Sequence, residues 1–312
     1  MQTDRGFLLT EQANPHSQNL DTLTPLELVA LFNQEDAYAV AAVAKEQPAI
    51  AAAIAVITKA LGGGGRLFYV GAGTSGRLGI LDAAECPPTF CSDPDMIQGI
   101  LAGGMAAMVR SSEALEDRAD DGAAAITERH ITAQDVVFGI TAGGTTPFVH
   151  GALQEAQKRQ AKTIFFACVP FDQVPSRYDV EIRPLVGPEI LAGSTRLKAG
   201  TATKLVLNII STGVMVQLGK VYGNRMVDVA VTNSKLEDRA IRIIRDIAGI
   251  SREAATALLV ASNKRVKVAL LMHWTGCTAS TAADLLQKNH GQLRLTRQQL
   301  TPNSLPESLN SL

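Results

Sequence analysis

Short apolar runs alternate with helical periodicity through the first two thirds of the chain. Residues 66–70, 96–101, 135–140 and 163–168 are short segments rich in Val, Ile, Leu and Phe, the composition of buried strands. Glycine-containing loops follow the first and third of them, and helical spacing follows each loop. Because strands that alternate with helices build a parallel sheet covered on both faces, we predict an α/β fold with a parallel sheet sandwiched by helices.

The N-terminal region predicts an extended arm and two helices. Thr24 followed by Pro25 is typical of a helix cap and a proline in the first turn. An Ala- and Ile-rich helix is expected over residues 44–61, since the four glycines at 62–65 cannot continue it cheaply.

Beyond about Gly219 the strand pattern fades and helical spacing takes over. We expect a small helical bundle, with helices over residues 235–248, 251–262, 266–274 and 278–289. The predicted organisation is therefore an N-terminal arm and helix over 1–56, a sheet domain over 57–220 and a C-terminal helical segment over 221–312.

Composition and charge exclude several classes of protein. The formal net charge of −1, without a long run of Lys or Arg, leaves no basic surface for nucleic acid or an anionic membrane, so neither partner is expected. No signal-peptide pattern and no apolar stretch of about 18 residues occurs, so we expect a cytoplasmic protein. The four cysteines are scattered, and no histidines have ligand spacing, so we expect reduced thiols and no metal site.

The loop over residues 71–76 has the composition of a phosphate-binding loop. Gly73 and Gly76 permit close approach of the backbone, Thr74 and Ser75 add hydroxyl groups, and the next helix would present unpaired N–H groups. The same glycine spacing fits a dinucleotide fingerprint. That alternative is weakened because the next strand ends in Ala-Gly-Gly, without the acidic residue that holds a ribose, and we expect no cofactor.

Two further segments repeat parts of this pattern. Gly144, Thr145 and Thr146 follow the strand over 135–140, and two such loops in neighbouring βα units are expected to converge on one phosphoryl group. A third loop, over 193–200, precedes a predicted helix over 201–218 and is a second possible anion site. Its candidate ligand contacts are Ser194, Thr195 and Lys198.

Two acidic residues between these loops are candidates for proton transfer. Glu85 lies in a largely apolar stretch just before Pro87 and Pro88, where we expect the helix to end and solvent access to be restricted. Glu116 is surrounded by other acidic residues, the pattern of a solvated helix face. From the residues alone, an ordinary surface carboxylate is the alternative at both positions.

Six segments resemble N-acetylmuramic acid 6-phosphate etherases in order and spacing over nearly the whole chain: residues 10–21, 68–90, 101–104, 113–122, 193–213 and 220–233. The stretches ECPPTF and STRLKAGTATKLVLN are the most specific. The resemblance implies a sugar isomerase (SIS) fold over about 57–220, a homodimer, a small sugar-phosphate substrate, and catalytic roles for Glu85 as acid and Glu116 as base.

The second loop departs from this resemblance. Etherases commonly have Ser-Gly-Arg-Thr-Pro where this chain has Gly143-Gly-Thr-Thr-Pro147, which removes a hydroxyl and a guanidinium. Two other functions stay open for a SIS fold: a non-catalytic sugar-phosphate sensor like the glucokinase regulatory protein, and an aldose–ketose isomerase.

Overall fold

The structure is a computed structural model that describes residues 5–110 and 113–300. The described chain divides into two compact units. The N-terminal unit extends to Val214, except for Pro88–Ser92, and the C-terminal unit consists of those five residues and the chain from Met215 onward.

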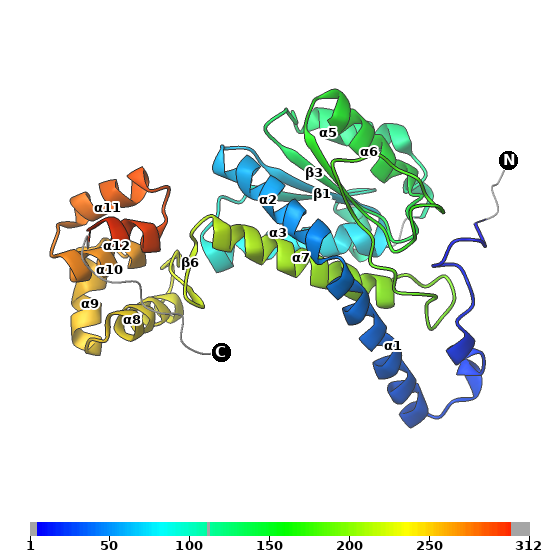
Figure 1. Ribbon diagram of the computed structural model, residues 1–312, viewed down its shortest axis with the longest axis horizontal. Helices are drawn as coiled ribbons and strands as arrows, with labels where there is room; N and C mark the ends of the chain where they lie inside the picture. Colours follow the sequence, from blue (N-terminus) through cyan, green and yellow to red (C-terminus); the bar gives the residue numbers. More distant parts are fainter. Residues whose placement is uncertain (1–4, 111–112, 301–312) are drawn as a thin grey trace. The chain divides into compact units, whose positions relative to one another are not determined.

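A five-stranded sheet forms the centre of the N-terminal unit (Figure 1). Its strands are β1 (Leu67–Gly71), β2 (Ile97–Leu101), β3 (Val136–Ile140), β4 (Lys162–Phe166) and β5 (Val180–Ile182). Their order is β2-β1-β3-β4-β5, and every neighbouring pair is parallel. The predicted fold class is confirmed, and the four expected strands are present within one or two residues. The three-residue strand β5 was not expected.

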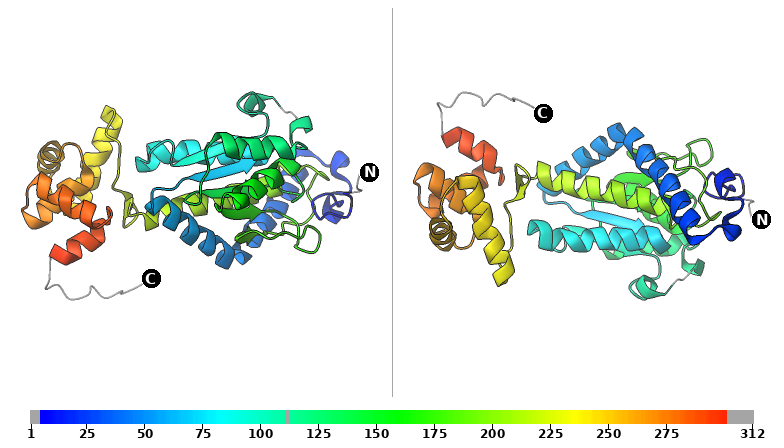
Figure 2. Two further views of the ribbon diagram at one scale, coloured as in Figure 1. Left: turned by 90° about the horizontal axis from the view of Figure 1, so that it is seen from above. Right: turned by 90° about the horizontal axis from the view of Figure 1, so that it is seen from below.

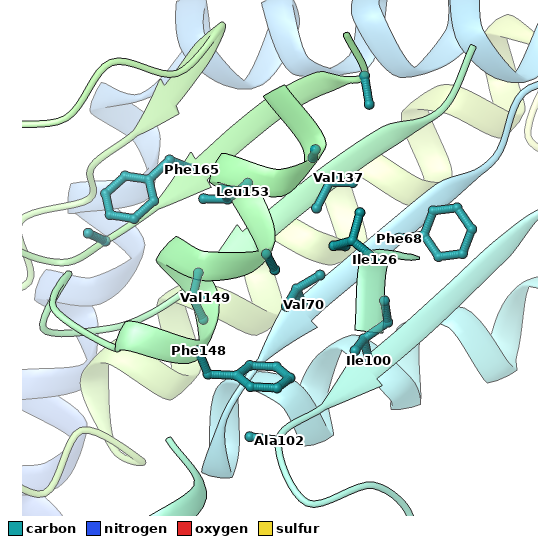
Figure 3. Close-up of a cluster of buried hydrophobic side chains, with 14 of the residues drawn as sticks. Phe68, Val70, Ile100, Ala102, Ile126, Val137, Phe148, Val149, Leu153 and Phe165 are labelled. Carbon is teal, nitrogen blue, oxygen red and sulfur yellow. The ribbon is translucent and has the colours of Figure 1, made fainter. Parts of the chain in front are cut away.

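Helices cover both faces of the sheet (Figure 1). On one face, α5 (Ala119–Glu128) and α6 (Pro147–Lys158) enclose an apolar core. In Figure 3, Phe68 and Val70 of β1 and Val137 of β3 lie with Val149 and Leu153 of α6 in this core. The other face carries α2 (Gln47–Gly62), α3 (Gly73–Phe90) and α7 (Lys198–Gln217).

The helix that begins at Thr24 and Pro25 is confirmed as α1 (Pro25–Lys45). The Thr24 hydroxyl accepts a hydrogen bond from the N–H of Glu27, whose carboxylate accepts one from the N–H of Thr24, a capping box. Short helical segments complete the unit: η1 (Pro15–Ser17), η2 (Leu20–Thr22), α4 (Ala106–Val109) and η3 (Glu113–Leu115).

The expected helix end before the two prolines was wrong, because α3 continues through Pro87 and Pro88 to Phe90. A proline in a helix loses one backbone hydrogen bond and crowds the preceding turn. Here Cys86 and Phe90 are both buried on either side of the prolines. Their burial stabilises a helical path that the local sequence disfavours.

The C-terminal unit is a helical bundle, as expected, seen from yellow to red in Figure 2. It contains α8 (Ser234–Ala248), α9 (Arg252–Ala261), α10 (Val266–Thr275), α11 (Ala279–Lys288) and α12 (Leu293–Leu300). The prediction that strands end near Gly219 was wrong, since β6 (Val221–Tyr222) and β7 (Arg225–Met226) form a small antiparallel pair. Strands of two residues are too short to produce a periodic pattern.

Helix α7 is long and apolar enough to cross a membrane by length and composition alone. Half of its most apolar window is buried within the structure. Its Ser211 hydroxyl donates a hydrogen bond of 3.1 Å to Asp82 of α3, and Tyr69 of β1 donates one of 3.0 Å to the same carboxylate. These contacts are those of a core helix in the N-terminal unit.

Candidate functional site

The sheet order brings the two predicted phosphate loops to adjacent positions. Strand β1 lies between β2 and β3, so the strand order reverses at β1. Gly71 pairs with Ile140 at the carboxyl ends of β1 and β3. In open parallel sheets this switch point is where ligands bind. The loops that follow β1 and β3 therefore meet at the carboxyl edge of the sheet, that is, at the end where its parallel strands finish.

The first loop is compact because the backbones of Gly71 and Gly76 are in close contact. A Cβ on Gly71 would lie 2.6 Å from the nitrogen of Gly76, and a Cβ on Gly76 would lie 2.5 Å from the Gly71 carbonyl oxygen. Gly73 has a φ of 53°, which favours glycine. Thr74 and Ser75 occupy the first turn of α3, where N–H groups lack helical acceptors. Their half-buried hydroxyls are placed to contact an anion at this edge.

The second loop is fixed by hydrogen bonds of its own. The hydroxyls of Thr141 and Thr146 lie 2.8 Å apart, and Gly144 has a φ of 74°. The carbonyl of Gly144 accepts a hydrogen bond of 2.7 Å from Nε2 of His150, and Nδ1 of the same ring lies 2.8 Å from the Tyr178 hydroxyl. His150 thus supports the loop, and the half-buried Thr145 and Thr146 lie at its junction with α6.

A cavity of about 350 Å³ connects the first loop with the third. Its lining residues come from α3 and from the region around the start of α7: Thr74, Leu78, Arg196, Gly200, Thr201, Lys204 and Leu205. Two cationic side chains therefore share a concave surface with a hydroxyl of the first loop, an arrangement suited to an anionic group. Arg77, in contrast, donates to the carbonyls of Ala107 and Met108.

The third loop carries Lys198 in a buried ion pair. Its Nζ atom lies 2.6 Å from the carboxylate of Glu35, and Glu189 accepts hydrogen bonds from the backbone N–H groups of Lys198 and Ala199 at 2.8 and 2.9 Å. The ammonium and the first N–H groups of α7, which we expected to be open to an anion, thus have protein partners. A ligand contact by Lys198 stays a prediction, as it does for the half-buried Ser194 and Thr195.

The N-terminal arm brings residues to this edge that the sequence analysis missed. A Cβ on Gly143 of the second loop would lie 3.5 Å from the hydroxyl of Thr10, and one on Gly193 of the third loop would lie 3.1 Å from the carboxylate of Glu11. Thr10 is fully buried, and its hydroxyl has no hydrogen-bond partner among the described residues. The sequence feature that could have pointed to Thr10 and Glu11 is their position at the start of the motif TEQANPH.

Glu85 lies on α3, away from the loops. Gly76 packs beside Gly71 and Gly79 beside Tyr69, so α3 runs back along β1. Glu85 is the twelfth residue after Gly73, about 18 Å along a helix that rises about 1.5 Å per residue. Its side chain is exposed in the single chain, so the prediction of restricted solvent access at Glu85 was wrong for that chain.

Glu116 lies beside the loops. It is half-buried in a turn after η3, not on the solvated helix face that we expected. Its carbonyl accepts a hydrogen bond of 2.9 Å from the N–H of Phe148, in the first turn of α6. Within one chain, therefore, the turn with Glu116 adjoins the carboxyl edge of the sheet, whereas Glu85 lies toward the opposite end of β1.

Comparison with known proteins shows which domains the chain contains, and the result agrees with this geometry. A family model described as the glucokinase regulatory protein N-terminal SIS domain matches residues 49–157, and one described as the C-terminal lid domain of that protein matches residues 223–268. The N-terminal unit thus contains a SIS domain. Among solved structures, the chain is similar to a phosphoheptose isomerase from Francisella tularensis, with 18% identity, a TM-score of 0.47, and coverage of 62% of this chain and 100% of that one.

Curated relatives are much more similar. The N-acetylmuramic acid 6-phosphate etherase of Rippkaea orientalis is 66% identical over 291 residues, 93% of this chain and 95% of that protein. That of Synechococcus elongatus is 68% identical over 94% of this chain and 95% of its own length. The chain belongs to the N-acetylmuramic acid 6-phosphate etherase family.

Proposed function

We propose that the chain cleaves the D-lactyl ether of N-acetylmuramic acid 6-phosphate, giving N-acetylglucosamine 6-phosphate and D-lactate. The observation that carries this proposal is identity of about two thirds to etherases over nearly the full length of both chains. Removal of the C2 proton and departure of the C3 lactyl ether give an unsaturated aldehyde, and addition of water at C3 completes the reaction. The protein is thus a carbon–oxygen lyase.

The elimination requires a base at C2 and an acid at the departing ether oxygen, because an alkoxide is a poor leaving group. We assign the base to Glu116 and the acid to Glu85. The position of Glu116 beside the second loop supports its access to a sugar bound at the carboxyl edge. The same two groups in reversed roles would add water to the intermediate.

The two anionic groups of the substrate are assigned to different parts of the edge. The phosphate is held by backbone N–H groups and hydroxyls of the two loops, with Ser75 and Thr146 at the loop–helix junctions. The lactyl carboxylate is held by Arg196 and Lys204 in the adjoining cavity. Because the second loop lacks the arginine common in etherases, phosphate binding here depends mainly on backbone N–H groups.

A homodimer would complete the active site. Glu85 and Glu116 of one chain lie toward opposite ends of β1, so a second copy is needed to bring a Glu85 carboxylate to the loops. An apolar groove of about 430 Å³ on α1, α2 and α7 supports an interface with this second copy. It is lined by Val40, Val43, Ala44, Gln47, Ile50, Ala51, Ile54, Leu205 and Ile209. We place this dimer in the cytoplasm, in a cell-wall recycling role.

Incubation of the purified protein with N-acetylmuramic acid 6-phosphate tests the function directly. We expect stoichiometric D-lactate and N-acetylglucosamine 6-phosphate, without added metal or nucleotide. A ketose product that retains the lactyl group would identify an isomerase. Tight binding without turnover would identify a sugar-phosphate sensor, and either result would overturn the proposal.

A further inference from the structure

The C-terminal unit contains a cavity of its own, of about 460 Å³. All of its lining residues belong to that unit: Cys91, Lys220, Val227, Asp228, Val229, Lys264, Arg265, Val266, Lys267, Ala283, Leu286, Gln287 and Gly291. The volume is within the range of sites that hold small metabolites, roughly 300–1,000 Å³. The proposed etherase reaction assigns no role to this cavity.

The charge of the cavity wall is strongly unbalanced. Among the residues that the structure describes, four cationic side chains and one carboxylate line it, which gives the wall a formal charge of +3. Asp228 is shared between Lys267 at 2.6 Å and Lys220 at 3.3 Å. Lys264 pairs with Glu237 at 3.6 Å, and Arg265 has no ion-pair partner within residues 5–110 and 113–300. Asp228 and Glu237 carry two negative charges against the four cations, so the wall keeps an excess of positive charge.

The buried ammonium of Lys267 is the centre of this unbalanced charge. Lys267 is 7% exposed, and burial lowers its pKa, although Asp228 opposes the shift. Lys220 and Arg265 lower the pKa of Lys267 further by repulsion, so these cations lie close enough to interact. An anion among them would replace repulsion with attraction.

The backbone adds positive potential at the same wall. Arg265, Val266 and Lys267 line the cavity where α10 begins, and no side chain in the described part of the protein caps that helix. In the same bundle, α8, α9 and α11 are capped by side chains of Asn233, Ser251 and Thr278. The first N–H groups of α10 are thus available to an acceptor supplied from outside the chain.

We propose that this cavity binds the phosphate group of a small phosphorylated metabolite. Lys267, Lys220 and Arg265 would contact the phosphate together with the N–H groups at the start of α10. Val227, Val229 and Leu286 supply an apolar side of the same cavity for the carbon portion of the ligand. The site lies entirely within the C-terminal unit, so this unit binds the phosphorylated compound with its own residues.

Cys91 provides a local reporter, because its exposed thiol lines this cavity. We would label the full chain with the uncharged reagent iodoacetamide and follow the Cys91 and Cys277 peptides separately by mass spectrometry. Inorganic phosphate and glycerol 3-phosphate should slow labelling of Cys91 saturably and leave Cys277 unchanged. Tighter binding of glycerol 3-phosphate would favour an organic phosphate, and equal binding would favour free phosphate.

Charge-reversal variants provide the decisive comparison. Arg265→Glu should raise the Kd of phosphate at least about tenfold, the loss expected for one charge-assisted contact. Lys288→Glu is the matched control, an exposed cation of α11 outside the cavity, and should keep the parental Kd. Lys267→Met, checked for folding by circular dichroism, should abolish protection. The proposal is overturned if sodium chloride at equal ionic strength protects Cys91 as well as phosphate, or if Arg265→Glu is protected like the parent.

Discussion

The Nζ atom of Lys198 lies 2.6 Å from the carboxylate of Glu35, and both side chains are 2% exposed. Asn14 and His16 also contact this carboxylate, each at 2.7 Å. Burial by itself would raise the pKa of Glu35, but hydrogen bonds from Lys198, His16 and Asn14 together hold it below its ordinary value. The pair connects the N-terminal arm and α1 to the first residue of α7.

Replacing Glu35 with Gln should destabilise the protein strongly. The change leaves the Lys198 ammonium buried without a countercharge, a loss of about 3–5 kcal/mol in comparable pairs. Urea titration followed by circular dichroism would measure the free energy of unfolding. Exposed Glu128→Gln on α5 is the control and should change it by less than about 0.5 kcal/mol. Equal effects of the two variants would refute a structural role for the pair.

The ion pair of Arg66 with Asp135 should make folding sensitive to acid. Burial favours a raised pKa for Asp135, but hydrogen bonds from Arg66 and Thr132 outweigh it and lower the pKa below 3.8. A carboxyl whose folded-state pKa is depressed contributes its full stabilisation above the unfolded pKa. That contribution is lost as pH falls from about 4 through the folded value. Asp135→Asn should therefore flatten the fall in urea midpoint between pH 5 and pH 3, and an unchanged slope would contradict this.

The two loop hydroxyls should contribute specifically to binding of the phosphate. Ser75→Ala and Thr146→Val should each raise KM for N-acetylmuramic acid 6-phosphate about tenfold or more, as expected for a lost hydrogen bond to a charged group. The parent should turn over unphosphorylated N-acetylmuramic acid very poorly. Thr127→Val, which removes an exposed hydroxyl of α5, should leave KM unchanged. Equal turnover of both substrates would show that the loops serve another purpose.

Lys204 should contribute to substrate binding through the cavity at the first loop. Lys204→Met should raise KM by about tenfold, since it removes one of two cations that line this cavity. Lys59→Met, at an exposed position near the end of α2, is the matched control. Steady-state measurement of D-lactate release distinguishes the two variants. A similar KM in both would exclude a contact between Lys204 and the substrate.

The two glutamates should fail at different steps. Glu116→Gln should stop both D-lactate release and exchange of the C2 proton with heavy water, because the base acts first. Glu85→Gln should lower the rate of D-lactate release about 10²- to 10⁴-fold but still permit exchange of the C2 proton. Exchange lost in Glu85→Gln and retained in Glu116→Gln would reverse the roles. Parental release in both would remove these residues from the mechanism.

A mixture of these two inactive variants tests whether the active site is shared between subunits. If each site combines Glu85 of one chain with Glu116 of the other, half of the dimers formed at random are mixed and each has one intact site. Dissociation and reassociation should then restore about a quarter of the parental rate. No recovery in dimers shown to be mixed would place both glutamates in one chain.

The main features of the sheet could be predicted because they depend on local signals. The strands β1, β2, β3 and β4 are five-residue, mostly apolar segments, and α1 has its cap, its proline and its Glu27 within four positions. The two loops were predictable for the same reason, as glycine patterns directly after a strand.

What could not be predicted depends on partners far apart in the sequence. Glu35, which neutralises Lys198, precedes it by 163 residues, so nothing around Lys198 indicated that its ammonium is occupied. The helical path through Pro87 and Pro88 depends on burial of Cys86 and Phe90. The arm residues Thr10 and Glu11 reach loops that lie more than a hundred positions later, and no single-sequence pattern reports such contacts.

The pairing of β1 with β3 also has a consequence for how the chain folds. Strand β1 (Leu67–Gly71) cannot acquire both of its neighbours until Val136–Ile140 has been synthesised, so its edge that faces β3 stays unpaired until then. Pairings between distant segments slow folding and prolong the exposure of strand edges. Refolding of this protein from denaturant should therefore be limited by sheet assembly, and aggregation during expression should increase with the rate of synthesis.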